Sequence, residues 1–250
     1  RDNLVLAAGD LDGDGDLDLI TSFWSSTGQA SPPDGPYLGF AENTGTNESP
    51  TFSSHEQVSG FSTYTDAVSL ADIDADGDLD IVGMSSAGVF FAHPNTSAGG
   101  SISFAASESA PYGLSNVEAN FYDYGRRTQG FELVDVDLDG DLDLMVTGYD
   151  EASDDGVLFY YENEGGTPPA FGAGQSSPFG MTLPAVNWYD STSDFDAPFA
   201  FETADMDGDG DYDLLLGPGV RSESQTDPDT SETQVSVYTE YFYVENTTIQ

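Results

Sequence analysis

The stretch DLDGDGDLDLI at residues 10–20 sets a pattern that the chain uses four times. It recurs as DIDADGDLDIV at 72–82, DVDLDGDLDLM at 135–145 and DMDGDGDYDLL at 205–215. All four copies read D-x-D-x-D-G-D-x-D followed by two apolar residues, and their starts lie 62, 63 and 70 residues apart. Self-similarity at such a period is typical of repeat architectures.

The length of the repeat indicates a small sheet in each copy. The spacing is too long for one hairpin and suits a four-stranded sheet with its turns. We therefore expect a single β domain over 1–250, with repeats at approximately 1–60, 61–120, 121–190 and 191–250.

Two further elements recur downstream of the Asp-rich loops and support an all-β fold. Aromatic and β-branched runs closed by Asn, Gly or Pro are typical of strands, and they occur at 38–43, 89–94, 158–163 and 241–246. A Phe preceded by small residues or Pro follows in three repeats, at Phe52, Phe104 and Phe171, and predicts an outer strand. No segment has the 3.6-residue periodicity of a helix.

The spacing of the aspartates predicts a calcium site in each loop. Ca²⁺ takes six to eight oxygen ligands at about 2.3–2.6 Å. In a tight loop, alternate positions direct carboxylates inward, a central Gly allows a sharp turn, and a main-chain carbonyl joins the ligand set. Without a cation, so many neighbouring carboxylates would repel one another strongly.

Counted from its first Asp, each loop should supply side-chain ligands from positions one, three, five and nine and a carbonyl from position seven. The expected side-chain ligands are Asp10, Asp12, Asp14 and Asp18; Asp72, Asp74, Asp76 and Asp80; Asp135, Asp137, Asp139 and Asp143; and Asp205, Asp207, Asp209 and Asp213. The expected carbonyl ligands come from Asp16, Asp78, Asp141 and Asp211.

Other metals and other calcium loops fit the pattern less well. Mg²⁺ prefers few carboxylates and keeps its waters, and zinc would want His or Cys. An EF-hand needs Glu at position twelve and flanking helices, whereas this position holds Thr21, Gly83, Val146 or Leu216. The flanking residues alternate between apolar and polar, so we expect the loop to join two strands.

The loop, its strand context and its period resemble the FG-GAP or VCBS repeats of calcium-binding β-propellers, such as those of integrin α-subunits and many bacterial surface proteins. The resemblance covers nearly the whole chain. It implies a β-propeller-like array of four four-stranded blades, with mainly structural calcium bound by the four Asp sets named above. The departure is in number, because such propellers usually have seven blades.

The charge of the chain excludes several classes of partner. There are 46 acidic residues against 4 basic ones, for a formal net charge of -42. Phosphate contacts need clustered Lys or Arg, so we expect no nucleic-acid partner. We also expect no membrane insertion, since no apolar run approaches the roughly 18 residues needed to span a bilayer. The absence of cysteine excludes disulfides and thiolate sites.

The last repeat predicts a route to self-association. After Asn246 only residues 247–250 remain, so the last blade is expected to lack its outer strand. An unpaired sheet edge is a template for strand addition. Either the chain was cut from a longer array, or a neighbouring molecule supplies the strand and the copies associate head to tail, as in a filament.

Other constellations leave alternative functions open. Trp188, Tyr189, Tyr122, Tyr124 and the pair Arg126–Arg127 could form a glycan-binding or protein-binding patch. Asn47, Asn95 and Asn246 begin N-glycosylation sequons. His55 and His93 lie in no recognisable triad or zinc pattern, so nothing marks a propeller-type polysaccharide-degrading enzyme.

These patterns predict a non-enzymatic protein with a structural or adhesive role. We expect it to be secreted, extracellular or at the cell surface, because the millimolar calcium found there suits loops that need not bind tightly. The second hypothesis is a lectin-like module that binds glycans.

Overall fold

The computed structural model confirms the all-β prediction. Its only helices in the described residues are two short 3-10 turns, η1 (Pro111–Gly113) and η2 (Pro178–Gly180). The structure describes residues 5–25, 35–58, 65–85, 89–109, 111–114, 130–150, 155–166, 168–176, 178–181, 200–226 and 233–246.

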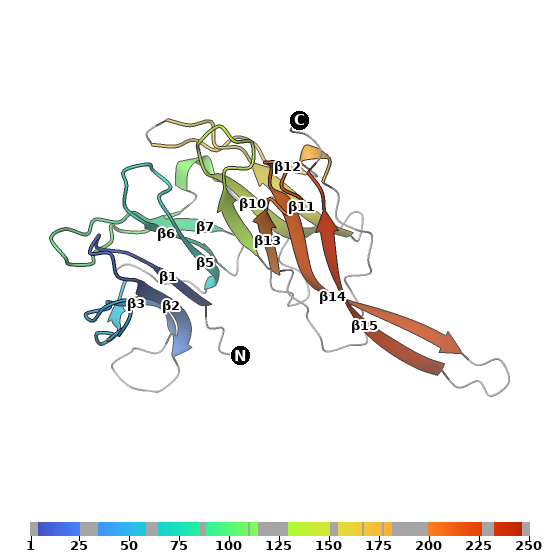
Figure 1. Ribbon diagram of the computed structural model, residues 1–250, viewed down its shortest axis with the longest axis horizontal. Helices are drawn as coiled ribbons and strands as arrows, with labels where there is room; N and C mark the ends of the chain where they lie inside the picture. Colours follow the sequence, from blue (N-terminus) through green and yellow to red (C-terminus); the bar gives the residue numbers. More distant parts are fainter. Residues whose placement is uncertain are drawn as a thin grey trace. The chain divides into compact units, whose positions relative to one another are not determined.

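The strands form four separate antiparallel sheets, each a meander in which neighbours in sequence are neighbours in space (Figure 1). The first sheet comprises β1 (Val5–Gly9), β2 (Asp18–Ser25), β3 (Gly35–Ala41) and β4 (Glu56–Gln57). The second comprises β5 (Thr65–Ala71), β6 (Asp80–Ser85), β7 (Phe90–His93) and β8 (Glu108–Ser109).

The other two sheets follow the same order. The third comprises β9 (Phe131–Val134), β10 (Asp143–Asp150), β11 (Asp155–Tyr161) and β12 (Gln175–Ser176). The fourth comprises β13 (Ala200–Ala204), β14 (Asp213–Thr226) and β15 (Thr233–Val244). Thus the fourth sheet has three strands among the described residues, where the other sheets have four.

The outer strands differ in detail from the sequence expectation. Phe52, Phe104 and Phe171 each form an isolated bridge, to Asn43, Asn95 and Asn163 respectively. The two-residue strands β4, β8 and β12 begin four residues after these phenylalanines. The Phe therefore starts the outer edge of the sheet, and the regular pairing comes after it.

The chain divides into two compact units, and the sheets pack in pairs within them. The first unit comprises Arg1–Val117 and Asn163–Gly172 and contains the first and second sheets. The second unit comprises Glu118–Glu162 and Ala173–Gln250 and contains the third and fourth sheets.

Alternation along the strands gives every sheet two apolar faces. Counting from the first Asp of each loop, we call the face that carries position eleven (Ile20, Val82, Met145 or Leu215) the forward face and the face that carries position ten (Leu19, Ile81, Leu144 or Leu214) the back face. In the first unit, the forward face of the first sheet and the back face of the second share one core. Its buried members are Leu11, Ile20, Leu38, Phe40, Val58, Ile81 and Phe91, with Ala7, Val68, Leu70, Leu79, Ile102 and Phe104 packed against it.

A close approach of β1 and β5 completes this contact. A Cβ built at Gly9 would lie 2.7 Å from Cδ1 of Leu79 and 3.0 Å from Cδ1 of Leu70. Only a residue without a side chain allows this spacing without a shift of both leucines.

The second unit repeats the arrangement. The forward face of the third sheet supplies Val136, Met145, Leu158 and Tyr160 to its core. The back face of the fourth sheet supplies Phe201, Leu214 and Leu216. Fully burying a large apolar side chain contributes about 1.5–3 kcal/mol, so these paired faces are a main source of stability in each unit.

Glu132 makes a polar link across the contact between the third and fourth sheets. Its Oε2 accepts a hydrogen bond from the backbone N–H of Thr203 at 2.9 Å, and its Oε1 accepts one from the Thr203 hydroxyl at 2.9 Å. Burial raises the pKa of Glu132 to about 7, and the charge of Glu202 adds to this effect. The hydrogen bonds from Thr203 oppose the shift.

Glu132→Gln should change how stability depends on pH. The folded chain holds the Glu132 proton more tightly than the unfolded chain, so this stabilisation is complete below about pH 4.5 and is lost as pH rises through about 7. The melting temperatures of wild type and variant should therefore diverge across this window, with the variant more stable at pH 8. The exposed Glu164→Gln makes the same charge change and serves as the control. Parallel melting-temperature profiles for wild type and Glu132→Gln would contradict the assignment.

Candidate metal centres

Each Asp-rich loop joins the first and second strands of its sheet and needs two left-handed backbone positions. Position four has positive φ even where it is not Gly, with 58° at Ala75 and 62° at Leu138. Position six is Gly throughout, with φ of 101° at Gly77 and 102° at Gly140. A Cβ at Gly77 or Gly140 would meet no atom within 4 Å. Backbone conformation, not space, therefore requires Gly at position six.

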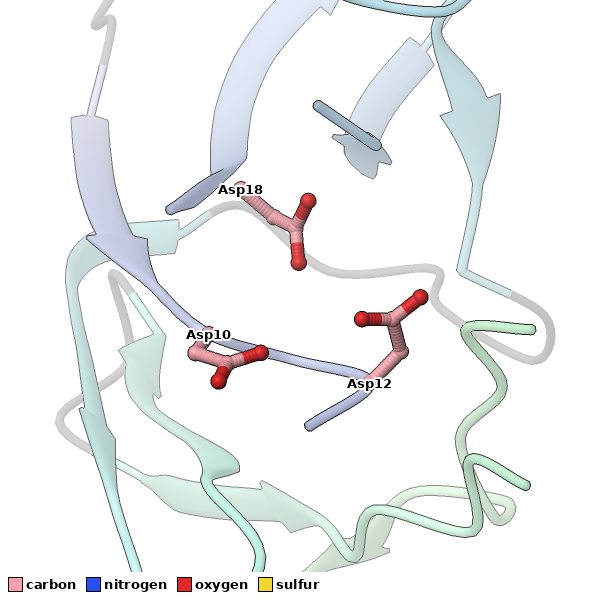
Figure 2. A group of neighbouring side chains, drawn as sticks. All are labelled: Asp10, Asp12 and Asp18. Atoms are coloured by element: carbon pink, nitrogen blue, oxygen red, sulfur yellow. The ribbon is translucent and has the colours of Figure 1, made fainter. Parts of the chain in front are cut away.

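This turn brings three carboxylates together in each loop. The ligand oxygens of each group lie within 4.8 Å of one another. The groups are Asp10, Asp12 and Asp18; Asp72, Asp74 and Asp80; Asp135, Asp137 and Asp143; and Asp205, Asp207 and Asp209. Figure 2 shows that the three side chains of the first loop converge on a common space: Asp10 lies just after β1, Asp12 within the loop and Asp18 at the start of β2.

The loops do not bring together all the predicted ligands. In the first three loops the group is made by positions one, three and nine, and in the fourth by positions one, three and five. Position five is engaged within the loop: Oδ1 of Asp14 accepts from the backbone N–H of Asp16 at 2.8 Å. The same contact measures 3.0 Å from Asp78 to Asp76. In the first three loops, no observed carboxylate group includes position five or seven. The ligand roles of these two positions therefore remain predictions.

The electrostatics of the groups favour a cation. Burial raises the pKa of Asp12, Asp74 and Asp137, and neighbouring carboxylates of the same loop raise it further. Oδ1 of Asp74 and Oδ1 of Asp135 are buried and accept no hydrogen bond. Buried carboxylate oxygens without a donor are costly, and a bound cation would supply the missing partner. The residues present therefore fit a metal ion with oxygen ligands.

The carboxylate at position nine has a second, structural task. Oδ2 of Asp80 accepts from the N–H of Ile73 at 3.3 Å, and its Oδ1 accepts from the N–H of Asn95 at 2.7 Å. Burial raises the pKa of Asp80 to about 6, although these two hydrogen bonds lower it. The same pair of contacts recurs at Asp18, from Leu11 at 3.0 Å and Asn43 at 2.7 Å. In these two sheets, position nine thus ties the loop to the Asn that lies two residues after the third strand.

The structural role of Asn95 was not predicted from the sequence, where this residue was marked only as the start of a sequon. It is only 5% exposed. Its Nδ2 donates to the carbonyl of Leu11 at 2.9 Å and to that of Leu79 at 3.0 Å. One amide therefore joins the loop of the first sheet to the loop of the second. The signal in the sequence was the Asn that recurs after the third strand of each repeat, at Asn43, Asn95, Asn163 and Asn246.

Asn47 supports the first loop from outside. Its Nδ2 donates to the carbonyl of Gly15 at 2.8 Å, its Oδ1 accepts from the N–H of Leu17 at 3.1 Å, and its N–H donates to Asp16 at 2.9 Å. No local pattern marks this residue, because its partners lie about 30 positions away.

These contacts bear on the glycosylation sequons. Both Nδ2 hydrogens of Asn95 are directed at carbonyl oxygens, and Asn246 is only 1% exposed. Neither amide is accessible for modification in the folded chain. Asn47 is exposed, and its sequon stays a prediction.

The histidines also lie in structural contacts. Nε2 of His55 contacts the hydroxyl of Thr21, and its ring lies 5.3 Å from that of Tyr37. His93 is buried, with Nδ1 3.1 Å from the carbonyl oxygen of Ala105. Burial lowers the pKa of both rings. The aromatic and arginine patch predicted from Trp188, Tyr189, Tyr122, Tyr124, Arg126 and Arg127 lies outside the described residues.

The sequence matches no protein-family model and is similar to no curated protein. Among the residues described by the structure, no helix is long and apolar enough to cross a membrane.

Asn95→Ala should destabilise the chain more than Asn47→Ala. The first change leaves two carbonyls, one of them in a buried contact, without their donor, and should cost about 2 kcal/mol. The second removes contacts that water can replace, and should cost below about 1 kcal/mol. Urea unfolding of both variants gives the comparison, and an equal or smaller loss for Asn95→Ala would contradict the role of this amide.

Gly77→Ala and Ala75→Gly should have opposite effects in the same loop. Ala at a φ of 101° is strained, and the change should cost about 1–2 kcal/mol. Gly at position 75 removes the strain at φ 58° at the cost of a more flexible unfolded chain, so the net change should lie between zero and about 1 kcal/mol of stabilisation. Thermal unfolding in chelator measures the backbone effect alone. A neutral Gly77→Ala would contradict the backbone requirement.

Proposed function

We propose that this protein is an extracellular calcium-binding repeat protein in which calcium stabilises the sheets. The observation that carries the proposal is the group of three carboxylates that recurs in every loop, with ligand oxygens within 4.8 Å of one another. Calcium is a hard cation that prefers such oxygen-rich sites, and it would supply charge compensation there.

The donor set favours calcium over other common ions. Each loop offers only oxygen ligands, and His55 and His93 are engaged in contacts away from the carboxylate groups. Zinc therefore lacks its preferred ligands. Magnesium demands a near-ideal octahedron and keeps several waters, which suits three or more clustered carboxylates poorly.

The proposed role is structural because of where the loops lie. Each loop connects the first two strands of a sheet. In the first, second and fourth sheets its ninth carboxylate also accepts a hydrogen bond from the Asn two residues after the third strand, as Asp80 does from Asn95. A cation that neutralises the carboxylates would therefore stabilise the loop together with its links to the first, second and third strands. Binding would then be coupled to folding.

The same features support a β-propeller-like arrangement of the FG-GAP or VCBS type. Sheets of this chain pack forward face to back face within each unit, which is how successive blades of a propeller meet. Adhesive or surface-array function, secretion, and strand sharing at the outer edge of β15 are the further parts of the proposal. Any protein or glycan ligand would be recognised outside the loops.

A glycan-binding module is the alternative function. Its support is limited to sequence, in the aromatic and arginine residues around positions 122–127 and 188–189. A glycan array probed in the presence of calcium separates this reading from a purely structural role.

Calcium should raise the melting temperature of the chain, and a chelator should lower it. At a free calcium concentration 100 times the dissociation constant, each site adds about 2.7 kcal/mol, so four sites should shift the melting temperature by at least about 10 °C.

Controls separate binding from charge screening. Magnesium and sodium chloride at matched ionic strength should give a smaller shift, although any cation screens a net charge of -42. Asp74→Asn should reduce the calcium-dependent shift, and the exposed Glu164→Gln should not. An unchanged melting temperature on chelation would overturn the proposal.

A further inference from the structure

Large apolar side chains that are exposed lie mostly on two sheet faces. Seven such residues occur in the described part of the chain. Three belong to the first sheet region (Leu6, Leu17 and Phe52), three to the fourth (Met206, Leu215 and Tyr243), and the last is Leu138 in the third loop. Contiguous exposed apolar residues mark interaction sites more often than isolated ones do.

The three residues of the fourth sheet lie on its forward face. Met206 occupies loop position two, Leu215 is the second residue after position nine, and Tyr243 pairs with Leu215. Their exposed fractions are 51%, 36% and 47%. The equivalent residues of the first sheet are Leu11, Ile20 and Phe40, which are 2%, 0% and 8% exposed because the second sheet covers them.

The three residues of the first sheet lie on its back face. Leu6 and Leu17 are 59% and 53% exposed, and Phe52 is 42% exposed. Their equivalents in the second sheet, counted from the loop and from the outer bridge, are Val68, Leu79 and Phe104. All three of those pack against the core shared with the first sheet.

The sheet-to-sheet contacts within each unit indicate which kind of surface would pack against the exposed faces of the first and fourth sheets. Phe104 of a back face meets Phe40 of a forward face edge-on, with ring centroids 6.0 Å apart. Phe52 and Tyr243 occupy the corresponding positions and are both exposed. Glu202 also repeats the position of Glu132, whose carboxylate bonds to Thr203 on the next back face. The exposed forward face thus carries both the apolar and the polar features of a sheet-to-sheet contact.

We propose that the forward face of the fourth sheet docks on the back face of the first sheet of a second copy of this chain. The occupant follows from continuity with the two observed interfaces, which pair the same positions of successive repeats. The contact is heterologous, so copies associate head to tail. It uses sheet faces and is independent of strand pairing at the edge of β15.

The high net charge of the chain determines the salt concentration at which association should be tested. A net charge of -42 opposes association of two copies. The experiment therefore uses the full 250-residue chain with calcium and about 150 mM salt, where the screening length is about 8 Å. Analytical ultracentrifugation over a range of protein concentrations gives the mass.

Single-face variants make the test specific. Leu215→Glu disables only the forward face, and Leu6→Glu disables only the back face. Wild type should exceed the mass of one chain, while each variant alone should be monomeric, with association weakened at least about tenfold. Mixed in equal amounts, the two variants should form a 1:1 dimer and nothing larger, because each retains the face that the other lacks. Gln175→Glu adds the same charge at an exposed site of β12 and should associate as wild type does.

Several results would overturn the proposal. One is a wild type that stays monomeric at every concentration. Another is variants that associate as wild type does, or a mixture that stays monomeric although both variants keep the wild-type melting temperature. A monomeric wild type whose melting temperature falls in Leu215→Glu and Leu6→Glu but not in Gln175→Glu would show that the two faces meet within one chain.

Discussion

In the first, second and fourth sheets, a buried carboxylate at the end of the Asp-rich loop joins the start of that loop to the segment after the third strand. Asp18 accepts hydrogen bonds from the N–H groups of Leu11 and Asn43, and Asp213 accepts them from Met206 and Asn246. Buried backbone N–H groups need acceptors, and these carboxylates supply them. In the first loop the same carboxylate belongs to the group that could hold a metal ion. In the first two repeats, a single residue thereby links the loop to the segment after the third strand and to a carboxylate group that could hold a metal ion.

Much of this arrangement could be predicted from local sequence. The repeated D-x-D-x-D-G-D-x-D pattern located all four loops, and the alternating residues around it predicted the strands on either side. Gly77 and its equivalents were correctly expected at the turn, since only Gly adopts a φ near 101° without strain. These features depend on neighbours within one loop, which is why spacing alone reveals them.

Features that depend on distant residues could not be predicted. Asn95 reaches Leu11, 84 positions away, and its sequon was the more visible pattern in the sequence. The position-nine carboxylates were expected only as ligands, because their partners after the third strand lie outside the loop. Exposure of Leu215 and Tyr243 likewise follows from which sheets meet, and equivalent residues in other repeats are buried.

The proposed calcium ions would neutralise clustered acids of the loops, but they would offset only a minor part of a formal charge of -42. The remaining acidity keeps the surface solvated and opposes close approach of copies unless cations screen it. Calcium binding by the loops is tested most directly by the number of calcium ions bound per chain, measured by equilibrium dialysis with elemental analysis at physiological salt. We expect four ions per chain, one for each carboxylate group. A chain that stays folded and retains no calcium at millimolar free concentration would contradict this expectation.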